Sequence, residues 1–290
     1  MYRILFILLL LLPFKGISEV FPLQIIQGYL FTEAVIEGEH VLVILDTGAP
    51  GLVLNQKYYK ADPESNVECT GINGNFEGKS RLLSKWTWLG VTAKNSTALV
   101  SDLSFLENSL HREVRALMGL SALSQFYVSI DYDSRTISVE KEMTEIPEGS
   151  FFKFQYADHL PMITCKVNGE KKTLGIDSGS ECNFLFNYQQ PGDEDLLADA
   201  SKVMVVGSDN KKDIRHRMMM TLEVNDSQIA TASEFIVDLK AERSFRHEDF
   251  DGMLGQSFLS QYNIIIHPGK QKIMLIPREI SGQMVSAIMP

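Results

Sequence analysis

Two aspartates stand out in this chain because each begins the same short tripeptide, Asp-[Thr/Ser]-Gly. Asp46 lies in "VILDTGAPGLVLN" and Asp177 lies in "LGIDSGSECNFLF", 131 residues later. In both segments an apolar run ends at the carboxylate, and a second apolar run follows the turn. Two carboxyl groups at one site can divide acid and base work, since one gives a proton while the other accepts one. The spacing therefore raises the question of whether the fold brings the two turns together.

The surrounding residues also repeat, so the two turns belong to a duplicated unit. Segment Ala34–Ala49 matches segment Cys165–Ser180, and a glycine stands eight residues before each aspartate, at Gly38 and Gly169. The dipeptides Glu-Gly and Asn-Gly between such segments are typical of β-hairpin turns. We therefore expect each aspartate to end the second strand of a hairpin.

A second pair of similar segments lies farther along the chain. Ala116–Val139 resembles Gly252–Leu275, and both contain two apolar residues followed by glycine, at Leu117–Gly119 and Met253–Gly255. Each has a Leu-Ser-Gln tripeptide, an aromatic residue, and two strand-like runs joined by a turn. An isolated Asp-[Thr/Ser]-Gly is an ordinary turn sequence. Two copies at matched positions of an internal repeat carry more information.

The middle of each repeat contains a Gly/Asn-rich stretch that we expect to form a hairpin tip. These stretches are "TGINGNFEG" (Thr70–Gly78) and "VGSDNKKDI" (Val206–Ile214). The tryptophans that follow the first stretch alternate as strand residues do, which indicates core packing. The candidate flap and substrate-binding residues at the tips are Gly71, Ile72, Asn73, Gly74, Gly207 and Ser208.

These patterns predict an all-β protein made of two similar, closed β-barrel-like lobes, residues 22–142 and 150–278. We expect a pseudo-twofold axis between the lobes, with a cleft along it. Short helices are predicted around Ser121–Gln125 and Ser257–Gln261, and Glu194–Ala200 is a third candidate.

Such an axis would bring Asp46 and Asp177 face to face. Neighbouring like charges resist joint ionisation, so one carboxyl keeps a proton while the other stays charged. The charged carboxylate can take a proton from water, and the protonated one can donate to a carbonyl oxygen. As supports for this dyad we expect the hydroxyls of Thr47 and Ser178, bonding across the lobe junction. Gly48 and Gly179 would leave the carboxylates uncovered, and these two glycines complete the supporting set.

With these motifs, residues 22–278 resemble a bilobal aspartic protease of the pepsin/retropepsin type, the known example of such a shared proton. That family carries Asp-[Thr/Ser]-Gly in each lobe, completed by a hydrophobic-hydrophobic-Gly segment. The near-equal lobes are more similar to a fused retropepsin dimer than to a long pepsin. Ala49 resembles retropepsins and Ser180 resembles pepsins, while Thr70–Gly78 lacks the flap tyrosine of pepsins. The resemblance implies an aspartic-type endopeptidase with Asp46 and Asp177 as catalytic residues.

The first 18 residues have the form of a secretory signal peptide. A basic residue, Arg3, precedes the apolar run Ile4–Phe14, and the small residues Gly16 and Ser18 follow. The run is short for a bilayer span, although a membrane anchor is the alternative. We expect cleavage near Ser18 and a secreted or periplasmic protein.

Charge and cysteine content limit the partners. The formal net charge is −10, and removal of the signal makes it about −12 because Arg3 and Lys15 are lost. An acidic surface disfavours nucleic acid and anionic membranes, and the basic stretch Lys211–Arg217 is expected to be a solvated hairpin. We expect a monomer that binds a peptide or protein substrate. Three cysteines make no full disulfide framework, and pairing of Cys165 with Cys182 stays open.

Histidine and cysteine spacing matches no metal motif, so we expect neither metal nor cofactor. Two other functions compete with proteolysis. The chain could be a catalytically weak protease-fold module that binds peptides or proteins. It could also be another two-carboxylate hydrolase such as a glycosidase, although the repeated tripeptide disfavours that reading.

Overall fold

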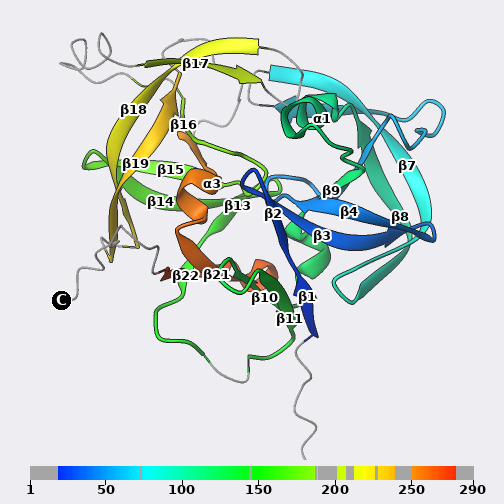
Figure 1. Cartoon of the computed structure of the whole chain (residues 1–290), viewed down its shortest axis with the longest axis horizontal. Coiled ribbons are helices and arrows are strands. Elements are labelled where there is room, and N and C mark those ends of the chain that lie inside the picture. The colour runs from blue at the N-terminus through cyan, green and yellow to red at the C-terminus, as the bar shows by residue number, and fades with distance from the viewer. Residues whose placement is uncertain are drawn as a thin grey trace, which may run out of the picture.

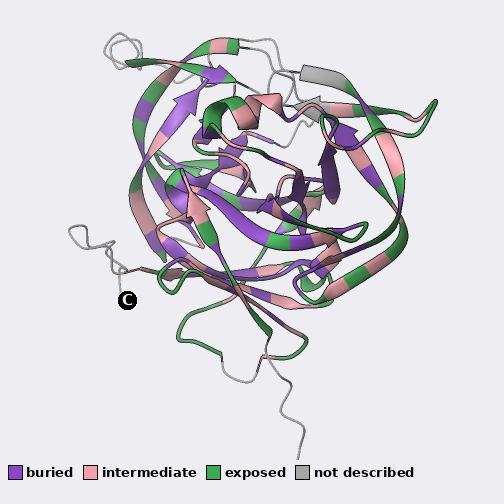
Figure 2. Cartoon of the chain, turned by 45° about the vertical axis from the view of Figure 1, so that its right-hand side comes forward, coloured by how far each residue is buried: buried purple, intermediate pink, exposed green. Residues whose placement is uncertain are grey.

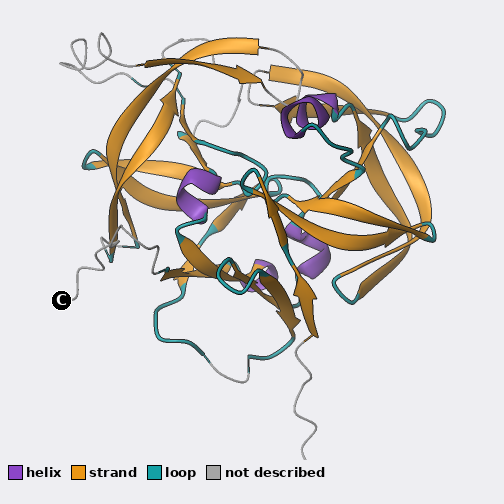
Figure 3. Cartoon of the chain, viewed as in Figure 1, coloured by secondary structure: helices purple, strands orange, loops and turns teal. Residues whose placement is uncertain are grey.

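The computed structural model describes residues 19–71, 74–143, 146–186, 188, 201–206, 212–225, 228–238 and 250–278. These residues are mostly β-strand, which confirms the all-β prediction, and the strands are arranged in three sheets (Figure 3). The expected signal peptide and the candidate helix Glu194–Ala200 lie outside the described residues.

The first eight-stranded sheet comes from the N-terminal half of the chain. Its strand order is β2-β3-β4-β9-β5-β8-β7-β6, with a further pairing of β3 with β7 that curls the sheet back on itself. The strands are β2 (Gln24–Ile26), β3 (Tyr29–Ile36), β4 (Glu39–Leu45), β5 (Leu52–Asn55), β6 (Asn66–Gly71), β7 (Gly74–Trp88), β8 (Val91–Ser101) and β9 (Ala116–Met118).

The second eight-stranded sheet comes from the C-terminal half and follows the same order, β13-β14-β15-β20-β16-β19-β18-β17, with β14 pairing again with β18. In both sheets the third and fourth strands in the order are parallel, as are the fifth and sixth. The strands are β13 (Gln155–Ala157), β14 (Leu160–Val167), β15 (Glu170–Ile176), β16 (Asn183–Leu185), β17 (Ser201–Val206), β18 (Lys212–Val224), β19 (Ile229–Val237) and β20 (Gly252–Leu254).

A six-stranded sheet lies below the other two in Figure 1 and takes strands from both halves of the chain. Its order is β1-β11-β10-β21-β22-β12, so the first described strand and the last one share a sheet. The strands are β1 (Glu19–Pro22), β10 (Tyr127–Asp131), β11 (Thr136–Glu140), β12 (Phe152–Lys153), β21 (Tyr262–His267) and β22 (Lys272–Pro277).

Helices are few and short among the described residues. The two predicted near Leu-Ser-Gln are the 3-10 helix η1 (Leu120–Leu123) and the α-helix α3 (Gln256–Leu259), each beginning one residue earlier than expected. A further 3-10 turn, η2 (Pro268–Lys270), joins β21 to β22. Helix α1 (Ser104–Leu110) was not predicted, although Leu106 and Leu110 bury one face of it.

Two of the predicted hairpin turns have the backbone that their dipeptides favour. The β3–β4 turn is Glu37-Gly38, with φ of 51° and 91°, and the β14–β15 turn is Asn168-Gly169, with φ of 49° and 80°. Two consecutive positive φ values define the tight turn that matches the twist of paired strands. The hairpins therefore deliver both aspartates to the ends of equivalent strands, β4 and β15.

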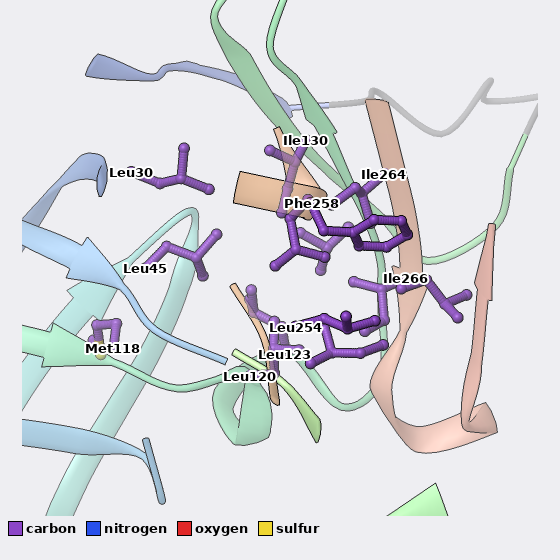
Figure 4. Close-up of a cluster of buried hydrophobic side chains, with 14 of the residues drawn as sticks. Leu30, Leu45, Met118, Leu120, Leu123, Ile130, Leu254, Phe258, Ile264 and Ile266 are labelled. Atoms are coloured by element: carbon purple, nitrogen blue, oxygen red, sulfur yellow. The ribbon is translucent and has the colours of Figure 1, made fainter. Parts of the chain in front are cut away.

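The largest of three clusters of buried apolar residues takes side chains from all three sheets. Figure 2 shows buried residues on the inward faces and exposed residues on the outward faces. The two tryptophans lie in the core as expected, and Trp88 is completely buried, with its indole nitrogen donating to Thr32 Oγ1. Figure 4 shows where side chains from the three sheets meet: Leu30, Leu45, Met118, Leu120, Leu123, Ile130, Leu254, Phe258, Ile264 and Ile266.

One expectation about charge is wrong. Arg215, in the stretch predicted to be solvated, is only 3% exposed. Its guanidinium lies 3.6 Å from the carboxylate of Asp213 and 3.7 Å from that of Asp238, so acidic partners accompany it into the interior. No helix in the described parts of the chain has the length and apolarity to span a bilayer.

Candidate active site

Each aspartate is fixed at its backbone by the apolar-apolar-Gly segment of the same sheet. The amide of Asp46 donates to the carbonyl of Met118, and the amide of Asp177 donates to the carbonyl of Leu254, both at 2.9 Å. These carbonyls end β9 and β20, the short strands that lie parallel to β4 and β15. The second repeated motif therefore holds the first one in place.

The glycines of these segments are needed for close approach. A Cβ on Gly119 would lie 2.2 Å from the carbonyl oxygen of Ala49, and one on Gly255 would lie 2.3 Å from that of Cys182. Backbone at this distance cannot move aside as a flexible side chain can. A larger residue at either glycine would therefore displace the aspartate loop packed on it.

The two aspartate loops bond directly to each other. Thr47 Oγ1 accepts from the Ser178 amide at 2.9 Å and donates to the Ile176 carbonyl at 2.6 Å. Ser178 Oγ accepts from the Thr47 amide at 3.0 Å and donates to the Leu45 carbonyl at 2.8 Å. Thr47 is 4% exposed and Ser178 is 2% exposed, so water does not compete for these bonds. The cross-junction hydroxyl bonds expected from the sequence are present.

Each carboxyl group lies against the glycine of the opposite loop. A Cβ on Gly48 would lie 2.8 Å from Asp177 Oδ1, and a Cβ on Gly179 would lie 2.4 Å from Asp46 Cγ. Within each loop the glycine amide donates to its own aspartate, from Gly48 to Asp46 Oδ1 at 2.8 Å and from Gly179 to Asp177 Oδ1 at 2.9 Å. The structure thus brings the two aspartates together and orients both side chains.

The protein environment raises the pKa of both carboxyl groups, and burial is the main cause for each. The pKa of Asp177 rises well above its usual value because the charge of Asp46 and a hydrogen bond with it also disfavour ionisation. The hydrogen bond with Asp177, the amide of Gly48 and the charge of His159 limit the rise in the pKa of Asp46. The two carboxyl groups titrate as a pair, and the raised pKa values favour a state in which they hold one proton between them.

Two side chains from outside the tripeptides, those of Tyr29 and His159, also interact electrostatically with the dyad, and the sequence analysis named neither of them. Burial raises the pKa of Tyr29, and the charges of Glu181, Asp177 and Asp46 raise it further. Burial lowers the pKa of His159, whereas the charges of Asp46 and Asp158 and the backbone of Gly48 raise it. Tyr29 is the first residue of β3, and His159 is the turn residue just before β14, positions that carry no motif.

A buried polar pair supports the second loop. Gln256, at the start of α3, donates from its side-chain amide to the Ser178 carbonyl at 2.9 Å. The hydroxyl of Tyr132 donates to the side-chain oxygen of Gln256 at 3.0 Å. The loop is therefore held by its own sheet, by the opposite loop and by a side chain that comes after β10 of the six-stranded sheet.

The predicted flap residues are only partly placed. Gly71 and Gly74 pair with each other at the tip of the β6–β7 hairpin, as expected for a tight turn. The other four candidates, Ile72, Asn73, Gly207 and Ser208, lie outside the described residues. A role for this set in binding substrate stays a prediction.

The open question of a disulfide is answered, because Cys69, Cys165 and Cys182 are all free thiols. Among the described residues, no three His, Cys, Asp or Glu side chains gather as metal ligands. No model of a known protein family matches the chain, and no curated protein matches it at a significant level.

Proposed function

We propose that the chain is an aspartic-type endopeptidase that hydrolyses peptide bonds with Asp46 and Asp177. One observation carries this proposal: the two Asp-[Thr/Ser]-Gly loops bond reciprocally, and each carboxyl group lies against the glycine of the other loop. The raised pKa values of the two carboxyls favour a state with one shared proton. Aspartic proteases are the established example of that state.

In the proposed reaction the ionised Asp46 takes a proton from a water molecule, whose oxygen attacks the peptide carbonyl carbon. Asp177 donates its proton to the carbonyl oxygen, which gives a tetrahedral diol. As the C–N bond breaks, the proton held by Asp46 passes to the leaving nitrogen, and one diol hydroxyl returns a proton to Asp177. The dyad ends in its starting state, so the cycle needs no metal or cofactor.

The same proposal includes the arrangement of the three sheets into two lobes with a cleft between them. The identical strand orders of the two eight-stranded sheets support two acid-protease lobes, residues 22–142 and 150–278, related by a pseudo-twofold axis. An extended peptide would lie in a cleft between them and be held as a strand. We further propose that the mature protein is a secreted or periplasmic monomer.

The test is cleavage of a peptide library by residues 19–290 between pH 3 and pH 7, with and without pepstatin. We expect pepstatin-sensitive cleavage that Asp46→Asn and Asp177→Asn each abolish. Asp62→Asn is the matched control, because Asp62 is an exposed aspartate outside both loops. Turnover that survives both dyad substitutions would remove the assignment. Tight peptide binding without turnover would favour the binding module instead.

A further inference from the structure

The two apolar-apolar-Gly segments are followed by different side chains, Leu120 in the first copy and Gln256 in the second. Gln256 is buried, so its polar groups must find partners inside the protein. It finds two of them on the second aspartate loop. Its backbone amide donates to the Ser180 carbonyl at 2.8 Å, and its side-chain amide donates to the Ser178 carbonyl at 2.9 Å. The apolar side chain of Leu120 can make no such bond to the first loop.

The partners of Gln256 fix the orientation of its side-chain amide. A carbonyl oxygen only accepts hydrogen bonds, so the amide nitrogen must face the Ser178 carbonyl. The amide oxygen then faces the hydroxyl of Tyr132 at 3.0 Å, and that hydroxyl must donate. Burial raises the pKa of Tyr132, so the phenol keeps its proton in acid and at neutral pH. In the other copy, the residue at the position that matches Tyr132 is Pro268, which cannot donate.

The Ser178 carbonyl belongs to the same peptide unit as an amide that faces the dyad. The Gly179 amide of this unit donates to Asp177 Oδ1 at 2.9 Å. A hydrogen bond accepted by one group of a chain polarises the next and strengthens its bond, by about 10–30% per bond. A chain of donors therefore runs from Tyr132 through Gln256 and this peptide to the carboxyl group of Asp177.

The first loop has the last bond of this chain without the side chains that precede it. The Gly48 amide donates to Asp46 Oδ1 at 2.8 Å, as its counterpart does in the second loop. Leu120 has no donor with which to polarise the peptide that carries this amide. The two carboxyl groups thus receive equivalent backbone bonds from peptides in different settings.

We propose that Gln256 and Tyr132 are positioning residues that strengthen the hydrogen bond from the Gly179 amide to Asp177. Both act through the peptide that links Ser178 to Gly179. In the proposed mechanism Asp177 gives up its proton as the diol forms, and a stronger bond to its oxygen stabilises the carboxylate that remains. This catalytic part of the inference rests on the proposed protease function.

The first experiment reads the hydrogen bond itself, from the NMR chemical shift of the Gly179 amide proton in the purified protein. A weaker hydrogen bond moves an amide proton upfield. We expect an upfield shift in Gln256→Leu and a smaller one in the same direction in Tyr132→Phe. The second variant leaves the bond between Gln256 and the loop in place, so it tests whether the effect passes along the chain. An unmoved Gly179 proton in both variants would overturn the proposal.

Two other amides distinguish this effect from a general disturbance of the loop. The amides of Thr47 and Ser178 donate to hydroxyls of the opposite loop, so their proton shifts report the geometry of the junction. Both should keep their wild-type shifts in Tyr132→Phe. Movement of these two protons together with that of Gly179 would mean that the pair only supports the loop, and the proposal would fail.

The second experiment measures peptide cleavage. Gln256→Leu should lower kcat roughly tenfold with little change in KM, because the weakened bond lies on a catalytic carboxyl group and not on the substrate. Gln261→Leu is the matched control, since its side-chain amide also donates to a backbone carbonyl, that of Ser257 at 2.8 Å, outside both aspartate loops. Equal kcat values in the two variants would overturn the catalytic part. Absence of cleavage in the wild type, with the amide protons shifted as expected, would count against the protease alone.

Discussion

Replacing Thr47 with valine tests whether the two loops hold each other as the hydrogen bonds indicate. Valine has nearly the shape of threonine but no hydroxyl, so the substitution removes bonds without opening a cavity. It removes the acceptor of the Ser178 amide and the donor to the Ile176 carbonyl, both in a buried setting. A buried polar group left without its partner costs about 1–3 kcal/mol, so the loss of both bonds should cost about 2–6 kcal/mol.

The assay is urea unfolding of residues 19–290 at neutral pH, read as a change in the free energy of unfolding. Thr87→Val is the matched control, since Thr87 also bonds through its hydroxyl, to Thr92 Oγ1 at 2.9 Å, but at the exposed surface. The control should lose about 0.5 kcal/mol or less. A cost for Thr47→Val similar to that of the control would refute the idea that these bonds join the loops.

Because the hydrogen bonds between the two loops are reciprocal, the same unfolding assay can also test whether the two halves of the network depend on each other. Ser178→Ala removes the other two bonds, from the Thr47 amide and to the Leu45 carbonyl. Once one half of the network is lost, the loops can separate and admit water, which lessens the cost of losing the rest. The double variant should therefore be less destabilised than the sum of the single variants, by about 0.5–3 kcal/mol. Strict additivity would mean that the two halves act independently.

Three other predictions follow from the dyad and the thiols. Gly179→Ala should reduce peptide cleavage more than Gly48→Ala, because its Cβ would lie 2.4 Å from Asp46 Cγ, against 2.8 Å between a Gly48 Cβ and Asp177 Oδ1; equal rates in the two variants would contradict this. Asp177 has a raised folded-state pKa, so its contribution to stability is complete below the unfolded value of about 3.9 and is lost as pH rises through the folded value. The asparagine in Asp177→Asn cannot ionise, so the urea midpoint of this variant should fall less between pH 4 and pH 7 than the midpoint of the wild type. An equal fall in both proteins would show that the pKa of Asp177 is not raised. Because all three cysteines are free, a thiol reductant should leave the thermal unfolding temperature unchanged, and a lowered temperature would reveal a disulfide.

The positions of the aspartates were predictable because local turn chemistry and internal repetition agree. Glu37-Gly38 and Asn168-Gly169 specify tight hairpins. A two-residue turn fixes which residues of the two strands pair, so it also fixes where the aspartate at the end of the second strand lies. The same hydrophobic-hydrophobic-Gly segment recurs later in each repeat, so the shared strand order could be expected as well. An internal repeat in the sequence predicts the structure that its two copies share, and the two aspartates belong to the shared part.

Features outside the repeated motifs were not predictable in this way. Helix α1 lies in the first half and has only seven residues, of which Leu106 and Leu110 are the buried apolar ones. Two leucines are too few to show a helical pattern in a sequence dominated by strands. Arg215 was expected in solvent because its neighbours in sequence are basic, whereas its partners Asp213 and Asp238 decide its burial and one of them is distant in sequence. Such contacts depend on which strands pair, and the local pattern does not report that.

The differences between the copies nevertheless give the two carboxyl groups different electrostatic surroundings. If the two halves were identical, neither carboxyl group would have a reason to hold the proton in preference to the other. His159 stands where the first sheet has Gly28, and Tyr29 stands where the second has Leu160, whose side chain packs over Gly175. These differences change no strand pairing, yet Tyr29 and His159 both interact electrostatically with the carboxyl groups, and the charge of Asp46 raises the pKa of each. The repeated backbone therefore sets where the carboxyl groups meet, and unrepeated side chains make the surroundings of the two groups unequal.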